Sequence, residues 1–130
     1  MKKILIFGSF DILHKGHLNL FKQAREHGGK LIAVIARDET IKKLKGKAPR
    51  HREKTRLRHV AKHVDLAVLG NKTNKYAIIK RIKPDVICLG YDQNSFTKDL
   101  KKHFRGKIIR LKPYKPHIYK SSKMSFTSKK

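Results

Sequence analysis

The sequence predicts an α/β fold: a Rossmann-like, doubly wound parallel sheet of about five strands in a single domain. Three observations lead to this prediction. Short apolar runs, rich in β-branched residues, alternate with segments whose apolar residues recur at helical spacing. The connections between these runs are long enough for right-handed crossovers between parallel strands. The length of 130 residues suits one hydrophobic core and is short for two.

The first third of the chain predicts a strand, a helix and a second strand. Residues 3–7 form a short apolar run typical of a buried parallel strand. Apolar residues then recur at helical spacing over 18–24, and Gly28 and Gly29 end this helix. Residues 31–36, LIAVIA, predict the second buried strand. This strand–helix–strand order is the repeating unit of a parallel sheet.

The middle of the chain predicts two more helices and a strand. Asp38 is expected to cap a short helix that runs through Leu44. The segment 43–52, KLKGKAPRHR, contains glycine, proline and many basic residues, so we expect a mobile, charged loop. A helical pattern over 53–63, with an apolar face of Leu57, Val60 and Ala61, leads into the strand 66–69.

The last third completes the alternation and ends in a basic tail. A helix around 76–82 stops at Pro84, the strand 86–89 follows, and a further helix near 100–104 precedes a strand at 107–111. After residue 111 we expect a loop and a short helix capped by Ser121 or Ser122. We assign residues 1–124 to the domain, and we expect residues 125–130 to be a disordered basic tail.

The composition is strongly basic, with 34 Lys and Arg residues, 9 Asp and Glu residues and a formal charge of +25. Such a charge favours anionic partners, namely nucleotides, phosphorylated metabolites, nucleic acid or an acidic membrane surface, without choosing among them. The single cysteine, Cys88, lies within an apolar run and is expected to be a buried, inert thiol in a reducing compartment. The apolar run near the N-terminus is too short for a signal peptide or a membrane span, so we expect a soluble cytoplasmic protein.

The segment GSFDILHKGH, residues 8–17, directly follows the first predicted strand. In a doubly wound sheet, ligands bind at the carboxyl ends of the strands. If a helix begins near Gly16 or His17, then His14 and His17 stand at its N-terminus, where unpaired N–H groups and the helix dipole favour an anion. Imidazoles there can donate hydrogen bonds to phosphate and stabilise developing charge. Gly16 would admit a phosphate close to the backbone, and Gly8 would let the chain turn sharply.

Other phosphate and metal motifs do not fit this segment. The sequence contains neither the Walker pattern G-x-x-x-x-G-K-[ST] nor the dinucleotide pattern G-x-G-x-x-G. The two histidines could bind zinc, but only Asp11 is nearby to add to them, so we predict no metal-ligating residues here. Asp11 could also simply cap the turn.

The segment GSFDILHKGH resembles the G-[ST]-F-D-x-x-H-x-G-H signature of the cytidylyltransferase-like nucleotidyltransferase superfamily. The resemblance extends over residues 3–124. Within the superfamily, ARDETIKKLKG and LGYDQ are most similar to archaeal FAD synthases, which transfer AMP from ATP to FMN. The resemblance implies a nucleotidyltransferase that uses Mg²⁺ and forms a homodimer, with ATP and FMN as its substrates. A cytidylyltransferase using CTP and glycerol 3-phosphate or another phospho-alcohol is the alternative.

The resemblance also implies roles for individual residues. His14 and His17 match the histidines that bind the nucleotide phosphates and stabilise the transition state, and Asp11 would lie near the reacting phosphates. Residues expected to bind the nucleotide are Gly8, Ser9, Phe10, Gly16, Lys43, Lys45, Arg52, Gly90, Asp92, Ser121 and Ser122. For the lysines, a solvated surface is the stronger interpretation, because lysines occur throughout the chain and most must lie at the surface. The C-terminal segment PHIYKSSK departs from the cytidylyltransferase pattern R-T-x-G-I-S-[ST]-[ST], because the arginine has no direct counterpart.

The implied mechanism is direct transfer. A phosphate oxygen of the acceptor attacks the α-phosphorus of the triphosphate in line, and pyrophosphate leaves. Because that oxygen is already anionic, the enzyme needs only to position the reactants and stabilise charge. A non-catalytic nucleic-acid-binding protein on the same fold is the remaining interpretation, suggested by the charge and weakened by the lack of interleaved aromatic residues.

Overall fold

The computed structural model describes residues 2–71, 74, 76–90 and 99–112. The elements follow the predicted order of alternating strands and helices. They are β1 (Lys3–Gly8), α1 (Lys15–Arg25), β2 (Lys30–Ile35), α2 (Asp38–Lys45), α3 (Glu53–Ala61), β3 (Leu66–Leu69), α4 (Ala77–Ile82), β4 (Val86–Leu89), α5 (Leu100–His103) and β5 (Lys107–Arg110). Each predicted strand is present, with its bounds shifted by at most one residue.

The five strands form a parallel sheet in the order β3-β2-β1-β4-β5. The first strand lies at the centre, where Ile4 aligns with Leu31 of β2 on one side and with Val86 of β4 on the other. From β1 the chain winds outward first through β2 and β3, and then returns to add β4 and β5. This arrangement is the predicted doubly wound sheet, with its switch in strand order between β1 and β4.

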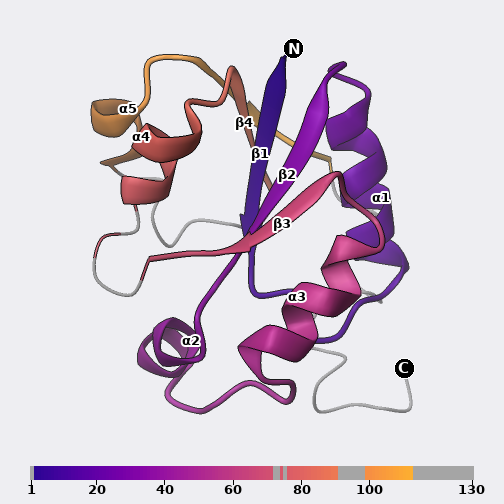
Figure 1. Cartoon of the computed structure of the whole chain (residues 1–130), viewed down its shortest axis with the longest axis vertical. Helices are drawn as coiled ribbons and strands as arrows, with labels where there is room; N and C mark the ends of the chain where they lie inside the picture. Colours follow the sequence, from indigo (N-terminus) through magenta and orange to yellow (C-terminus); the bar gives the residue numbers. More distant parts are fainter. Residues whose placement is uncertain (1, 72–73, 75, 91–98, 113–130) are drawn as a thin grey trace.

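Helices cover both faces of the sheet, and Figure 1 shows α1 and α3 on one side and α4 and α5 on the other. Successive residues of β1 alternate between two core clusters. Ile4 and Ile6 pack with Phe21 and Val60 beneath α1 and α3. Leu5 packs with Ile78 and other residues beneath α4 and α5. The thiol of Cys88 is buried in the first cluster, as predicted, and burial raises its pKa to about 11.

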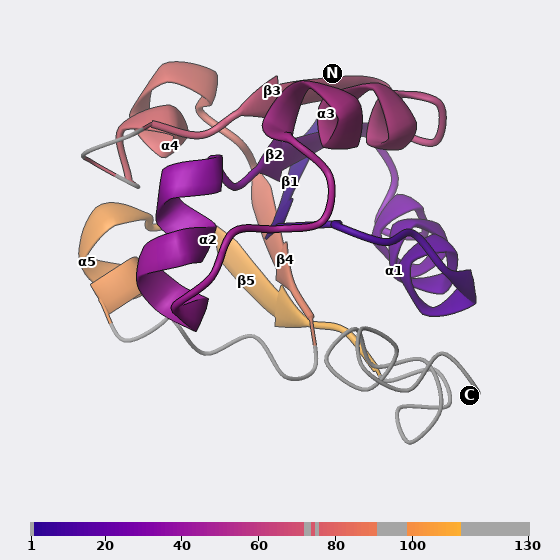
Figure 2. The same ribbon diagram turned by 90° about the horizontal axis from the view of Figure 1, so that it is seen from below.

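The helix α2 occupies a different place from the other four. It lies beyond the carboxyl ends of β1 and β2 instead of on a sheet face, as Figures 1 and 2 show from two directions. Only Ile41 of this helix is buried. The basic residues of its last turn are exposed, so α2 brings cations to the edge of the sheet at which the predicted site lies.

Four carboxylates hold the sheet and its connections by accepting hydrogen bonds from backbone amides. Asp85 accepts from the N–H of Lys3 at the start of β1, and Asp65 accepts from the N–H of Leu31 in β2, both at 2.8 Å. Two more carboxylates, Glu53 and Asp11, accept from backbone amides near the carboxyl ends of the strands.

Among the described residues, no helix is long and apolar enough to cross a bilayer.

Candidate active site

The two histidines of the predicted site lie together at the start of α1. The helix begins at Lys15, so His14 is its N-cap and His17 lies in its first turn. The imidazole rings stack with their centroids 4.0 Å apart and an interplanar angle of 28°. Nδ1 of His14 accepts a hydrogen bond of 3.0 Å from the N–H of Gly16. With Nδ1 as acceptor, the neutral ring carries its proton on Nε2, which is then a hydrogen-bond donor.

Both imidazoles are shifted toward their neutral forms. Burial lowers the pKa of His14. The pKa of His17 falls to about 3, mainly because its ring is buried, and further because the charges of His14 and Lys45 lie nearby. A hydrogen bond with the backbone of Ile12 acts in the opposite direction. At neutral pH the pair therefore presents neutral hydrogen-bond donors at a helix N-terminus, and the charge of an incoming phosphate would raise both pKa values.

Phe10 and Gly8 take structural roles that differ from the predicted ones. The Phe10 side chain is 3% exposed and packs in the core against the rings of His17 and Phe21. The ring therefore belongs to the core, and the expected contact of Phe10 with the nucleotide stays a prediction. The sharp turn after β1 occurs at Phe10, whose φ is 49°, and not at Gly8. Gly8 instead leaves room for the Phe10 ring, because a Cβ at position 8 would lie 2.7 Å from Cζ of Phe10.

Asp11 fastens the turn to a distant segment. Its two carboxylate oxygens accept hydrogen bonds from the N–H groups of Arg50 and His51, at 2.7 and 2.8 Å. These partners lie in the connection between α2 and α3, where the sequence predicts a mobile loop. The structure instead anchors that connection to the turn that carries the histidines. The carboxylate of Asp11 thus holds the two segments together. The sequence analysis had allowed a structural role for Asp11, as a cap of the turn.

Arg56 is the residue of this region that the sequence analysis missed. Its side chain is fully buried, the only charged one among the buried residues described. The guanidinium donates to the carbonyls of Ser9, Ala36 and His51 and to the carboxylate of Asp38. A signal was present in the spacing, since Arg56 and Val60, four residues apart, are the buried positions of α3. The predicted apolar face placed Ala61 inward, whereas Ala61 is exposed.

The start of α2 is also held from outside the helix. Asp38 was expected to cap α2, but the N-cap is Arg37, and it makes no side-chain capping bond. Instead, the carboxylate of Glu53 accepts from the N–H of Asp38 at 2.9 Å and forms an ion pair with Arg37 at 3.0 Å. Arg37 in turn donates to the carbonyl of Gly70 at the end of β3. The carboxyl ends of β2 and β3 and the starts of α2 and α3 are thereby joined.

The remaining predicted residues are only partly brought together. Lys45 lies close enough to His17 to affect its pKa, although it is exposed at the surface like Lys43 and Arg52. Ser9 and Gly16 belong to the histidine turn itself. Gly90 follows β4 on the other side of the switch point, where its carbonyl accepts from Arg110. The predicted residues Asp92, Ser121 and Ser122 lie outside the described residues.

The residues described do not form a metal site of their own. Among them, no group of three or more His, Cys, Asp or Glu side chains is placed to hold a metal ion. Both oxygens of Asp11, the acidic residue next to the histidines in sequence, are occupied by backbone amides. Among the described residues, the donors near the histidines therefore do not form a protein-bound Mg²⁺ site.

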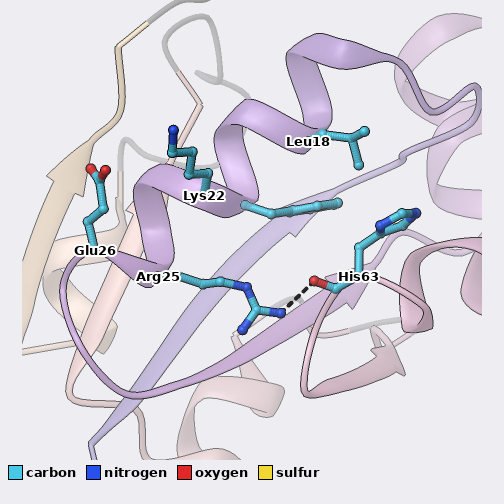
Figure 3. A pocket seen from close by; sticks show the side chains of 6 residues that line it. Leu18, Lys22, Arg25, Glu26 and His63 are labelled. Carbon is cyan, nitrogen blue, oxygen red and sulfur yellow. Dashed lines mark hydrogen bonds between the residues drawn. The ribbon is translucent and has the colours of Figure 1, made fainter.

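A separate hollow lies between α1 and the connection from α3 to β3. Leu18, Phe21, Lys22, Arg25, Glu26 and His63 line it. Figure 3 shows Leu18, Lys22 and Arg25 projecting from α1, with Arg25 reaching the carbonyl of His63 at 2.6 Å. None of the predicted site residues lines this hollow, so it is distinct from the histidine turn.

Comparison with known proteins agrees with this geometry. The sequence matches the cytidylyltransferase-like family over residues 5–125. The chain belongs to the cytidylyltransferase-like family. It is therefore a nucleotidyltransferase, and the histidine turn at the switch point is where the family signature GSFDILHKGH lies in this chain.

Members of the cytidylyltransferase-like family with curated names include two FAD synthases similar to this chain. The FAD synthase of Aciduliprofundum boonei is 38% identical over 120 residues, which cover 88% of this chain and 80% of that protein. The FAD synthase of Pyrococcus horikoshii is 37% identical over 129 residues, which cover 93% of this chain and 84% of that protein.

A solved structure confirms the fold. The lipopolysaccharide core biosynthesis protein from Thermoplasma volcanium is 36% identical to this chain, and the two structures superimpose with a TM-score of 0.81. The match covers 88% of this chain and 98% of that one. The doubly wound sheet is thus shared over nearly the whole of the related protein.

Proposed function

We propose that this nucleotidyltransferase is an FAD synthase, which transfers AMP from ATP to FMN and releases pyrophosphate. The observation that supports this proposal best is the stacked pair of His14 and His17 at the start of α1, in a chain 37–38% identical to two FAD synthases. The pair offers neutral N–H donors to phosphate oxygens at a place where the helix dipole already favours an anion.

The proposed reaction exchanges one phosphoanhydride linkage for another. An anionic oxygen of the FMN phosphate attacks the α-phosphorus of ATP and forms a new P–O bond. The bond from that phosphorus to the bridging oxygen of the β-phosphate breaks, and its electron pair leaves with pyrophosphate. No general base is needed, because the attacking oxygen carries no proton at neutral pH. A histidine nucleophile is not needed either.

The residues near the histidines would act by orientation and charge stabilisation. Nε2–H of His14 and the ring of His17 would donate to the triphosphate, and the N–H groups of the first turn of α1 would add to them. Lys45, whose charge lowers the pKa of His17, would neutralise part of the phosphate charge. Lys43 and Arg52 are exposed and would act only if substrate drew them inward.

Other parts of the site remain proposals of the same kind. The backbones of Gly8, Ser9 and Phe10, together with Gly16, would face the nucleotide, and Gly90 and Asp92 would approach its base and ribose. Ser121 and Ser122 would contact phosphate. Magnesium would enter with the triphosphate and supply charge neutralisation. We also propose a homodimer in the cytoplasm, with residues 1–124 as the catalytic domain and residues 125–130 as its tail.

The deciding experiment measures pyrophosphate release with magnesium, crossing ATP and CTP against FMN, glycerol 3-phosphate and phosphocholine. Release with ATP and FMN, lost in His17→Ala, would establish FAD synthesis. Release only with CTP and a phospho-alcohol would replace the proposal with a cytidylyltransferase. If no pair releases pyrophosphate while the protein shows salt-sensitive retention on nucleic acid, the non-catalytic binding function takes its place.

A further inference from the structure

The guanidinium of Arg56 joins residue 9, residues 36–38 and residue 51, which lie in three separate parts of the sequence. Nη1 donates to the carbonyl of Ser9 at 2.9 Å and to that of Ala36 at 2.7 Å. Nε donates to the carbonyl of His51 at 2.9 Å. Nη2 donates to the carboxylate of Asp38 at 2.7 Å. These acceptors lie after β1, after β2, in the connection between α2 and α3, and in the first turn of α2.

The burial of this charge places strict requirements on the groups around it. A fully buried guanidinium is costly to remove from water unless its donors are satisfied and its charge is paired. Three of the partners of Arg56 are backbone carbonyls, whose positions are set by the chain and not by a rotatable side chain. The fork of five N–H donors on arginine can reach all four acceptors at once, whereas an ammonium group offers three donors. The site therefore requires arginine specifically.

Two of these contacts bear directly on the predicted active site. Ser9 immediately precedes Phe10, the residue of positive φ at which the chain turns toward His14. His51 lies in the segment whose N–H groups are held by Asp11 from the same turn. Arg56 thus holds the carbonyls of Ser9 and His51. Asp11 holds two amides of the connection between α2 and α3, residues 46–52.

We propose that Arg56 is a positioning residue for nucleotidyl transfer. By holding the Ser9 and His51 carbonyls together, it fixes the spacing between the turn that carries the histidines and the basic segment 46–52. It touches no substrate and acts through these two backbone groups. The inference rests on the proposed function, because it assigns Arg56 a role at that same site.

The test compares Arg56→Lys and Arg56→Met with Arg25→Met. Arg25 is a suitable control because it too donates to a backbone carbonyl and pairs with a carboxylate, but at the surface hollow away from the histidines. Each variant is assayed at the same margin below its own melting temperature. We expect the two Arg56 variants to lower kcat/KM for ATP by about 10- to 100-fold, because misplacing a reacting group by an ångström has effects of that size. Arg25→Met should stay within about twofold of wild type.

A purely structural role gives a different result. In that case Arg56→Lys, once folded, would melt earlier but keep kcat and the KM for ATP within about twofold of wild type, and the proposal would be overturned. If Arg56→Met does not fold, Asp38→Asn provides the second probe, since it weakens one contact of the guanidinium and leaves three in place. We expect about a threefold to tenfold lower kcat/KM for that variant, and an unchanged value would also overturn the proposal.

Failure of the proposed function can be told apart from failure of this inference. If the wild-type protein releases no pyrophosphate with ATP and FMN, the function is wrong, but the positioning role is still tested by the affinity for ATP alone. Calorimetric titration should then show at least about tenfold weaker ATP binding by Arg56→Lys than by wild type. Equal affinity of the two proteins would refute the role of Arg56.

Discussion

Nδ1 of His14 accepts the N–H of Gly16 at 3.0 Å while the His14 ring stacks on His17 at 4.0 Å. Nδ1 of His14 therefore caps the helix, and Nε2 is the atom to which we assign the contact with phosphate. His14→Asn and His14→Ala test these two roles separately.

His14→Asn should keep the helix cap and lose the catalytic donor. Asparagine is among the best N-cap residues, so the free energy of unfolding should change by less than about 0.5 kcal/mol. Loss of the Nε2 donor should lower kcat by about 100-fold. His14→Ala should lose both and be about 1 kcal/mol less stable. Urea denaturation and pyrophosphate release measure the two effects; an active His14→Asn enzyme would remove His14 from the reaction.

The stability of the fold should decrease as the pH falls below about 6.5, the ordinary pKa of histidine. His17 stays neutral in the folded chain down to its pKa of about 3, whereas in the unfolded chain it binds a proton near pH 6.5. The unfolded state thus holds more protons between these values, and protonation favours unfolding. The lowered pKa of His14 acts in the same direction.

The measurement is the free energy of unfolding at pH 7.5 and pH 5, above the range in which most carboxylates titrate. The difference between the two values should be smaller in His17→Gln than in wild type, because the variant lacks the group that drives it. His59→Gln, on α3, is the control for the loss of a histidine as such. An equal pH dependence in all three proteins would contradict the assignment to His17.

Asp11→Asn should weaken the attachment of the 46–52 segment without changing the magnesium requirement. The amide can accept one of the two N–H groups of Arg50 and His51 but presents its own N–H₂ to the other. We expect a loss of about 1–3 kcal/mol in stability together with a lower kcat. The magnesium concentration for half-maximal activity should be that of wild type, measured at fixed ATP. A large rise in that concentration would instead show that Asp11 is a metal ligand.

Gly8→Ala should be destabilising by about 1–3 kcal/mol, because the new methyl group would overlap the Phe10 ring and force it out of its packing. Gly70→Ala is the matched control, since the nearest atom to a Cβ at position 70, Cγ1 of Val34, would be 3.4 Å away. Thermal or urea unfolding of the two variants makes the comparison. Similar losses at both positions would show that the Phe10 ring is not what position 8 must accommodate.

The order of elements could be predicted because it depends on local patterns. Charged residues and glycine flank the apolar run of β1, and similar residues separate each later strand from its neighbouring helix. This alternation predicted the doubly wound sheet. The histidine turn could be predicted for a similar reason, since the two residues are three apart on one turn of helix.

The network beneath the site could not be predicted, because its partners are distant in the sequence. Asp11 finds its partners 39 and 40 residues later, and Arg56 reaches back 47 residues to Ser9. In a chain with 34 basic residues, nothing in the composition separates the one buried arginine from the many at the surface. The place of the Phe10 ring could not be predicted either: its motif position suggested ligand contact, while the turn geometry places the ring in the core.

The four carboxylates that accept backbone amides limit how the composition of this chain can change. Asp11, Glu53, Asp65 and Asp85 accept hydrogen bonds from specific backbone amides, and the chain has only nine acidic residues in all. At other exposed positions, lysine can replace a polar residue at little cost to the fold, whereas lysine at these four positions would remove the acceptor. Among randomised variants selected for folding, the net charge should therefore vary widely, while acidic residues are retained at these four sites.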